Sequence, residues 1–291
     1  MFSDENLISI IIPFYEGNEY IRKSVTSVIK SSQNCAIHHE IQLLIVNDSP
    51  WEPVSLPRLQ GVEIIVNKKN CGIHVARKVG ITKAKGKYIL LLDQDDTIEE
   101  NFFEDMLTEY EKNPEIDCVV GNANFELLGK PTLLYKYRYS FSILNRKWFY
   151  FYDGCQIVSP GQALLKRTSI PKEWMNSRLS VNGADDYMLW VMMLVQKCNF
   201  KYIHNIVYNH HYTNHNVSND TEKMKLSEIS VFNILQQHDM ISEKECRKVI
   251  KRVDFQNKIR ERSSMRSRVL LGITNISIIV SYLIVKILRL R

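Results

Sequence analysis

The segment Tyr88–Asp96 constrains the fold more than any other part of the chain. Its first five residues are aromatic or apolar, and three carboxylates follow within the next four positions. A continuous apolar run of this length, stopped by polar residues, is typical of a strand that a parallel sheet buries on both faces. The carboxylates would then lie at the carboxyl end of that strand, where open α/β sheets bind their ligands. Clustered carboxylates repel one another, so the loop favours a hard divalent cation.

A second interpretation of the same loop is that it begins a helix. Thr97 and Glu100 have the spacing of a capping box, in which a hydroxyl and a carboxylate satisfy free backbone N–H groups. A capped helix can follow a metal-binding loop, so the two interpretations are compatible.

Strands and helices alternate along the first hundred residues, which predicts βαβ units and a mostly parallel sheet with flanking helices. We expect strands at 7–13, 40–46, 62–67 and 88–92, and helices at 19–31 and 73–85. Further on, we expect a helix at 102–111, strands at 116–124 and 161–166, and an apolar helix at 185–196. The aromatic stretch 130–152 has no clean period, and is interpreted either as a pocket cover or as ordinary core packing.

Composition limits the class of protein. Of the 291 residues 45% are apolar, which is enough for a sizeable core. The net charge of +6 comes mainly from residues after Lys244, which favours an anionic lipid surface over nucleic acid. Six cysteines without a CxxC spacing indicate neither a zinc site nor a disulfide framework. The acidic N-terminus lacks the basic start of a signal peptide, so we expect a cytoplasmic protein.

The C-terminal part is predicted to be a helical basic extension at 221–268 followed by a membrane-associated helix at 269–291. Val269–Val285 contains no formal charge and has arginines or lysines on both sides. A full span needs about 20 residues, so the segment either crosses the bilayer at the short limit or lies in the interface. A helix docked on the rest of the protein is the alternative.

Other polar groups follow predicted elements. Asp48 ends the second predicted strand, and the loop 67–72 leads to Arg77, whose cation would suit a pyrophosphate. Asp185 and Asp186 begin a predicted helix, where a carboxylate either caps the helix or acts as a general base. Three histidines at 210, 211 and 215 are either structural residues or contributors to a metal shell.

Taken together, these motifs resemble glycosyltransferase family 2, which has the GT-A fold. The resemblance covers a domain at 1–220 and depends on motifs that occur in order: 11–15, 46–49, 72–77, 84–88, 92–96 and 185–187. It implies an inverting transfer of a hexosyl group (EC 2.4) from a nucleotide-diphospho-sugar, most often UDP-linked, with Mg²⁺ or Mn²⁺.

The resemblance also implies roles for single residues. Asp48 matches the carboxylate that reads the base, Asp93 the acid near the ribose, and Asp95 the metal ligand. Asp186 matches the catalytic base, and His211 resembles a histidine near the metal, with His210 and His215 as alternatives. The other expected nucleotide-sugar contacts are Pro13, Tyr15, Glu16, Asn70, Gly72, Arg77 and Gln94, and the expected acceptor or donor-sugar contacts are Asp96, Asp185 and Gly161.

The sequence departs from the family pattern at three positions. Asn47 and Pro50 replace the usual Asp and Ser of an Asp-Asp-Gly-Ser motif, so base or ribose contacts are expected to differ. Asp185 stands where Glu is usual, and its shorter arm would shift the hydrogen bonds on the acceptor side.

For the acceptor, we expect a glycan or lipid-linked glycan of cell-surface polysaccharide synthesis at the inner face of the membrane. Two alternatives are a nucleotidyltransferase and a catalytically silent sugar-nucleotide-binding scaffold protein. A nucleotidyltransferase would carry a Gly-rich basic phosphate loop after the first strand, and residues 14–18 do not resemble one.

Overall fold

A computed structural model describes residues 7–57, 61–127, 130–136, 144–213 and 220–261, and seven positions between 275 and 284 (275, 276, 278–280, 283 and 284). The chain divides into two compact units. The first comprises 1–136, 159–170 and 197–214, and the second comprises 137–158, 171–196 and 215–291. Every described strand belongs to the first unit.

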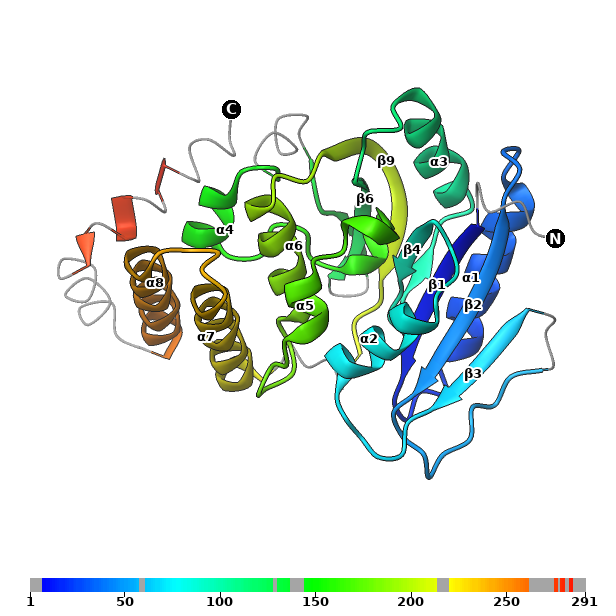
Figure 1. Ribbon diagram of the computed structural model, residues 1–291, viewed down its shortest axis with the longest axis horizontal. Coiled ribbons are helices and arrows are strands. Elements are labelled where there is room, and N and C mark those ends of the chain that lie inside the picture. Colours follow the sequence, from blue (N-terminus) through cyan, green and yellow to red (C-terminus); the bar gives the residue numbers. More distant parts are fainter. Residues whose placement is uncertain are drawn as a thin grey trace. The chain divides into compact units, whose positions relative to one another are not determined.

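One mixed sheet forms the centre of the first unit (Figure 1). Its strands are β1 (Leu7–Phe14), β2 (Glu40–Asn47), β3 (Val62–Val66), β4 (Tyr88–Leu91), β5 (Thr97–Ile98), β6 (Cys118–Leu127), β7 (Lys130–Leu133), β8 (Ala163–Lys166) and β9 (Phe200–His210). The strand order is β3-β2-β1-β4-β8-β6-β9-β5, and β7 pairs with β6. The first four strands in this order are parallel to one another. Beyond β4 the sheet is mixed, because β8 runs antiparallel to both β4 and β6.

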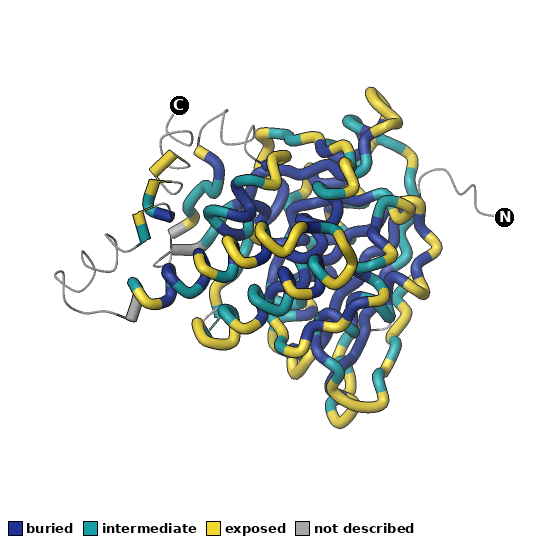
Figure 2. The backbone as a smooth tube through the Cα atoms, turned by 60° about the vertical axis from the view of Figure 1, so that its left-hand side comes forward, coloured by how far each residue is buried: buried dark blue, intermediate teal, exposed yellow. Residues whose placement is uncertain are grey.

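Helices cover both faces of the parallel half of the sheet, and this explains why β1 is apolar at almost every position. The helices are α1 (Ile21–Asn34), α2 (Ile73–Lys83) and α3 (Phe102–Lys112). Successive side chains of a strand point to opposite faces. Ile10 and Ile12 belong to the core that contains the buried residues of α1 and α3. Ile11 points the other way, and a Cβ added at Gly80 of α2 would lie 2.4 Å from its methyl group. β1 and β4 are accordingly buried along their whole length, and buried segments fill the interior of the tube drawing in Figure 2.

Two short elements correct the expectations for the region after β4. Thr97 does not cap a helix: it lies in β5, which pairs with β9, and α3 begins at Phe102 with no side-chain cap. Glu100 instead accepts a hydrogen bond from Asn34. The capping-box interpretation is therefore wrong. The strand expected from Gly161 begins at Ala163, because Pro160–Gln162 forms a 3₁₀ turn.

The described part of the second unit is helical. Its helices are α4 (Lys147–Asp153), α5 (Lys172–Asn176), α6 (Asp185–Val195), α7 (Thr221–Gln237) and α8 (Glu243–Glu261). Trp174 and Trp190 are fully buried there. In α4, Phe149, Tyr150 and Phe151 are also buried, so this part of the aromatic stretch packs as core. Residues 137–143 of the same stretch lie outside the described residues.

A membrane-crossing helix is not found in the part of the chain that the structure describes, since none of its helices combines the necessary length and apolarity. Most of the predicted membrane-associated helix at 269–291 lies outside that part.

Candidate active site

Three loops meet one edge of the sheet in the first unit. Because β1, β2 and β4 are parallel neighbours, their carboxyl ends lie at the same edge. The loops that follow them begin at Tyr15, Asp48 and Leu92, and they carry most of the predicted site residues. Pro13 is buried within β1, opposite Val46 of β2.

Gln94 fixes the loop after β1 to the loop after β4. Its side-chain amide accepts a hydrogen bond from the backbone N of Tyr15 at 2.9 Å and donates one to the backbone O of Tyr15 at 3.0 Å. A Cβ at Gly17 would lie 2.1 Å from the Gln94 amide oxygen, so only glycine leaves room for this contact. Gln94 therefore positions Tyr15 through its backbone.

An exposed aromatic pair stands at the same edge. Tyr15 is 44% exposed and Trp51 is 58% exposed, and their rings meet edge to face with centroids 6.0 Å apart. Glu16 holds the pair in place, because its carboxylate accepts a hydrogen bond from the Trp51 indole N–H at 3.0 Å and its backbone N donates to the Ser49 hydroxyl at 3.1 Å. Glu16 adopts a left-handed conformation (φ 47°), which is uncommon outside glycine. The two rings stand at 88° to each other and form a corner at this edge.

Asp48 organises the loop that precedes α2. Its carboxylate is buried and accepts hydrogen bonds from the Asn67 amide at 2.8 Å, the Cys71 backbone N at 2.9 Å and the Gly72 backbone N at 2.7 Å. Asn70 also accepts from the Gly72 N–H, at 3.0 Å, and Gly72 itself has a φ of 88°. This carboxylate already holds three donors of the protein.

Asn47, the first departure from the family motif, uses both halves of its amide. Its Oδ1 accepts hydrogen bonds from the backbone N of Ser49 at 2.8 Å and from the Ser49 hydroxyl at 3.0 Å. Its Nδ2 donates to the backbone O of Glu52 at 2.8 Å. An ionised aspartate has no proton to donate, so it would leave the Glu52 carbonyl without this bond. Asparagine therefore suits the backbone on both sides of Trp51.

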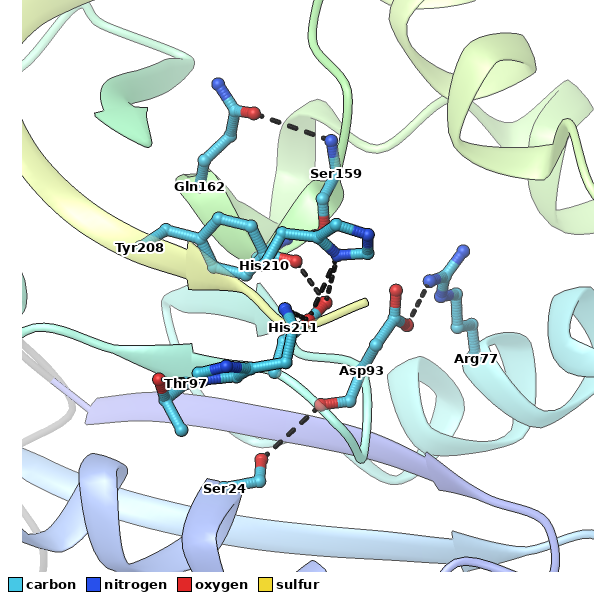
Figure 3. Close-up of polar contacts among 11 residues, drawn as sticks. Ser24, Arg77, Asp93, Thr97, Ser159, Gln162, Tyr208, His210 and His211 are labelled. Carbon is cyan, nitrogen blue, oxygen red and sulfur yellow. Dashed lines mark hydrogen bonds and ion pairs between the residues drawn. The ribbon is translucent and has the colours of Figure 1, made fainter. Parts of the chain in front are cut away.

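Arg77 is a partner of Asp93. The Arg77 side chain is 3% exposed, and its Nη2 lies 2.5 Å from Asp93 Oδ1. The Asp93 carbonyl accepts a weak hydrogen bond from Ser24 at 3.4 Å (Figure 3). Lys68 and Lys69, by contrast, are exposed. The buried cation near the loop thus neutralises the first of its three carboxylates.

Asp96 is the most buried of the three carboxylates, at 1% exposure, and it collects donors from β9 and the residue after it. The Tyr208 hydroxyl donates to its Oδ2, the His211 backbone N donates to Oδ1 at 2.9 Å, and His210 Nδ1 lies 3.0 Å from Oδ1 (Figure 3). A carboxylate so enclosed holds the end of β9 against the loop after β4.

Asp95 has a different environment from its two neighbours. Among the described residues, no other residue donates a hydrogen bond to its carboxylate. Burial, together with the negative charges of Asp96 and Asp93, raises the pKa of Asp95 from 3.8 to about 7. The ionised form is therefore short of positive charge.

This arrangement fits a divalent cation. The described residues contain no ready-made group of three ligands. Mg²⁺, however, is usually held by one or two carboxylates together with substrate phosphates and water. Asp95 would supply the carboxylate of such a site.

Of the three histidines predicted near the metal, His210 and His211 are described and make different contacts. His211 Nε2 lies 3.0 Å from the Thr97 hydroxyl. The His210 ring packs against Phe125 with centroids 4.8 Å apart. Burial alone would lower the pKa of His210, but its hydrogen bond with Asp96 and the charges of the acidic loop outweigh burial and raise it. His215 lies outside the described residues.

Gly161 permits a close approach between the 3₁₀ turn and β9. A Cβ at this position would lie 2.4 Å from the Tyr208 ring and 3.2 Å from Leu92. Ser159 and Gln162 form a capping box around the turn, and Gln162 also donates to the Gly121 carbonyl at 3.2 Å. Sequence analysis missed Tyr208, Gln162 and Trp51, since a lone aromatic or amide carries no spacing signal.

Asp185 and Asp186 lie at the start of α6 in the second unit. The Asp185 side chain is buried, and its backbone O accepts a hydrogen bond from the Trp174 indole at 2.7 Å. Asp186 is only partly buried, and its Oδ1 accepts from the backbone N of Tyr187 at 2.7 Å. A helix N-terminus favours an ionised carboxylate, and Asp186 lies in the first turn of α6.

Comparison with known proteins gives the family. The model of glycosyl transferase family 2 matches residues 9–174, which is more than half of the chain. The chain therefore belongs to glycosyl transferase family 2. The matched segment contains the three strand-end loops and ends before α6, so Asp185 and Asp186 lie beyond it.

Individual relatives are distant. Glycosyltransferase GlyG of Streptococcus pneumoniae is 25% identical over 122 residues, which is 40% of this chain and 38% of GlyG. The minor teichoic acid biosynthesis protein GgaB of Bacillus subtilis is 30% identical over 118 residues, or 38% of this chain and 13% of GgaB. The chain thus spans well under two thirds of the length of these relatives.

The fold is similar to that of S. aureus TarS. The structure of TarS residues 1–349 matches with a TM-score of 0.56 and 14% sequence identity, over 90% of this chain and 76% of that one. The predicted α/β architecture of the GT-A type, with C-terminal helices, is confirmed.

Proposed function

We propose that the protein is an inverting glycosyltransferase that moves a sugar from a nucleotide-diphospho-sugar, with UDP as the preferred nucleotide, to a glycan acceptor. Family membership supports the reaction class. The acidic loop supports a diphosphate donor most directly, because Asp95 forms no ion pair among the described residues and the attraction of His210 does not offset burial and the neighbouring negative charges. A metal–diphosphate complex would supply the missing positive charge.

TarS is described in complex with UDP and with UDP-GlcNAc, which supports the choice of nucleotide in a protein of this fold. The corner formed by Tyr15 and Trp51 suits a nucleobase, since aromatic rings stack on any base. Asp48 and the backbone of the 67–72 loop would border the base, and Asp93 would lie toward the ribose.

In the proposed reaction, an acceptor hydroxyl attacks the sugar C1 from the side opposite the leaving diphosphate. The acceptor O–C1 bond forms, the bond from C1 to the diphosphate oxygen breaks, and the electron pair leaves with the nucleoside diphosphate. Asp186 takes the proton of the hydroxyl. When bound, Mg²⁺ or Mn²⁺ held by Asp95 would supply Lewis-acid charge to the diphosphate.

A donor panel tests this proposal. The protein is incubated with UDP-, GDP- and dTDP-sugars in Mn²⁺ or in EDTA, and release of the nucleoside diphosphate is measured. Binding is followed by tryptophan fluorescence. Trp51 is the exposed member of the four tryptophans, so a stacked base should quench mainly its emission.

We expect Mn²⁺-dependent turnover and quenching with one or more UDP-sugars, and loss of the quenching in Trp51→Phe. Turnover of none of the three nucleotide classes would contradict the reaction. Metal-dependent binding without turnover, even with added glycan acceptors, would instead support the silent scaffold.

We further propose that the acceptor is part of cell-surface polysaccharide synthesis and that the protein works at the inner face of the membrane. The names of relatives such as GgaB support the first part. In support of the second, α8 exposes basic side chains at helical spacing: Lys244, Lys248, Lys251 and Lys258. Ile276, Val280, Leu283 and Ile284 are exposed at the spacing of one apolar helix face. A basic stretch followed by an apolar face is typical of an interfacial anchor.

Flotation with lipid vesicles tests this anchor. The full chain should bind vesicles that contain about one third anionic lipid and should lose binding in high salt. A chain truncated after Arg268 should bind weakly, and replacement of Lys244, Lys248 and Lys251 by glutamine should reduce binding to anionic vesicles. Undiminished binding of both variants would contradict the proposal.

A further inference from the structure

Arg252 is a buried cation in the second unit that stability alone does not explain. Its side chain lies on α8 and is 1% exposed. The ion pair with Glu228 of α7 is loose, at 3.7 Å, and the Arg252 Nε has no hydrogen-bond partner among the described residues. A buried charge with incomplete pairing costs stability, and a well-packed apolar residue in its place is often neutral or better.

The guanidinium contacts the helix that carries Asp186. Its Nη2 donates a hydrogen bond to the Tyr187 hydroxyl at 3.3 Å, and its Nη1 donates to Gln256 at 3.1 Å. The Tyr187 hydroxyl in turn donates to the backbone O of Tyr150 in α4. Tyr187 is itself 2% exposed, so its hydroxyl is held between α4 and α8 with no access to water.

Tyr187 also contacts the neighbouring carboxylate through its backbone. Its backbone N donates to Asp186 Oδ1 at 2.7 Å, in the first turn of α6. Asp186 and Tyr187 are consecutive residues of this turn. A rotation of the turn about the helix axis would therefore move both side chains together. Fixing the Tyr187 ring therefore fixes where the Asp186 carboxylate points.

The surrounding chain leaves space for the guanidinium. Gly154, which ends α4, has a φ of 104°, and a Cβ there would lie 3.3 Å from Arg252 Nη1. The next residue, Cys155, lies within electrostatic reach of Asp186 and Glu228. Burial raises the pKa of its thiol, and the negative charges of these two carboxylates raise it further. Asp186, Glu228 and Arg252 thus surround one small region.

We propose that Arg252 is a positioning residue for Asp186, which it orients through the Tyr187 hydroxyl. The inference rests on the proposed function, in which Asp186 is the base. It also gives the C-terminal extension, which lies outside the matched family segment, a part in the reaction.

Steady-state kinetics provide the first test. Arg252→Met should lower kcat about 10–100-fold, the cost of a small misplacement of a reacting group. KM for the donor and the affinity for UDP should change less than about twofold. Tyr187→Phe should have a similar effect, and the double variant should be no worse than either single one, because the two residues act in series. Arg252→Lys keeps the charge without the planar fork and should lie in between.

Arg247→Met is the matched control, since Arg247 lies on the same helix but is exposed and pairs with Glu243. Rates are divided by the fraction of protein that binds UDP, so partial misfolding cannot imitate a loss of kcat. If Arg252→Met lowers the melting temperature but keeps the parental kcat per binding site, the role is only structural and the inference is wrong.

Hydrogen exchange gives a readout that needs no turnover. The backbone N–H groups of Tyr187 and Met188 should exchange at least about tenfold faster in Arg252→Met than in Arg247→Met. Equal protection in the two variants would overturn the inference even if the parent proved inactive. An inactive parent with the expected exchange pattern would instead count against the proposed function alone.

Discussion

The acidic loop Asp93–Asp96 and the acidic pair Asp185–Asp186 hold their carboxylates on different kinds of backbone. In the loop, three carboxylates follow a buried strand, and burial together with their mutual repulsion raises the pKa of Asp95 to about 7. In the pair, Asp186 accepts a backbone hydrogen bond at a helix N-terminus, which stabilises the ionised form. The loop therefore gains from an added cation, whereas the pair is stabilised by its own helix.

The largest effect is expected at the helix. Asp186→Asn should lower kcat by about 10²–10⁴-fold, the usual contribution of a general base. Asparagine can still accept the hydrogen bond from the Tyr187 N–H, so the melting temperature should change little. The affinity for UDP in Mn²⁺ should match that of the parent, since the nucleotide contacts are proposed for the other unit.

Asp220→Asn is a suitable control for this variant. Asp220 caps α7 by accepting a hydrogen bond from the Lys223 backbone N–H at 3.0 Å, and asparagine is an equally good cap. Its rate should be parental. If Asp186→Asn also keeps the parental rate, the difference proposed between the acidic loop and the acidic pair is wrong.

Asp95→Asn should act through the metal. Loss of a group that only supports a metal ligand costs roughly 10–100-fold in metal affinity. Loss of the ligand itself should lower the metal-dependent affinity for UDP by at least as much. Calorimetric titration of UDP with and without Mn²⁺ measures this. If the variant gains as much affinity from Mn²⁺ as the parent, Asp95 is not the ligand.

The same variant should be more stable than the parent when metal is absent. The pKa of Asp95 is raised from 3.8 to about 7 on folding, so between these values the folded protein keeps a proton that the unfolded chain has released. Stability of the parent in EDTA should thus fall as pH rises through this window. The melting temperature of Asp95→Asn should exceed that of the parent by more at about pH 8 than at about pH 5. An equal difference in melting temperature at both pH values would show that neighbouring negative charges do not raise the pKa of Asp95.

How well the sequence predicted each region depended on local periodicity. Strands such as β1 and β4 are buried on both faces, so their apolar runs are visible in the sequence alone. β9 was missed because its solvent-exposed residues, such as Lys201 and Asn205, interrupt any apolar pattern. Its identity depends instead on pairing with β6, which lies far away in the chain.

The same distinction applies to the site. The carboxylates of the loop could be found because strand end and motif coincide. Which of them is buried, paired or crowded could not, since Arg77, Tyr208 and His210 approach from elsewhere in the chain. Arg252 lies still further from any motif, on a helix whose sequence indicates only a basic surface.

A smaller effect is expected from the loss of one hydrogen bond that supports the acidic loop. Tyr208→Phe removes the hydroxyl that donates to Asp96 and keeps the ring against Gly161. A hydrogen bond to a charged group contributes about 1.5–3 kcal/mol, so the free energy of unfolding in urea should fall by that amount. No loss of stability would mean that Asp96 does not depend on this donor.

The smallest effect is expected from restoring the usual family residue next to the loop. Asn47→Asp keeps the acceptor for Ser49 but cannot donate to the Glu52 carbonyl, which should cost about 1–2 kcal/mol of unfolding free energy. Urea denaturation measures the loss, and UDP affinity shows whether the shifted backbone also moves Trp51. If the variant is as stable as the parent and binds UDP more tightly, the asparagine at position 47 alters nucleotide contacts and is not required for the local hydrogen bonds.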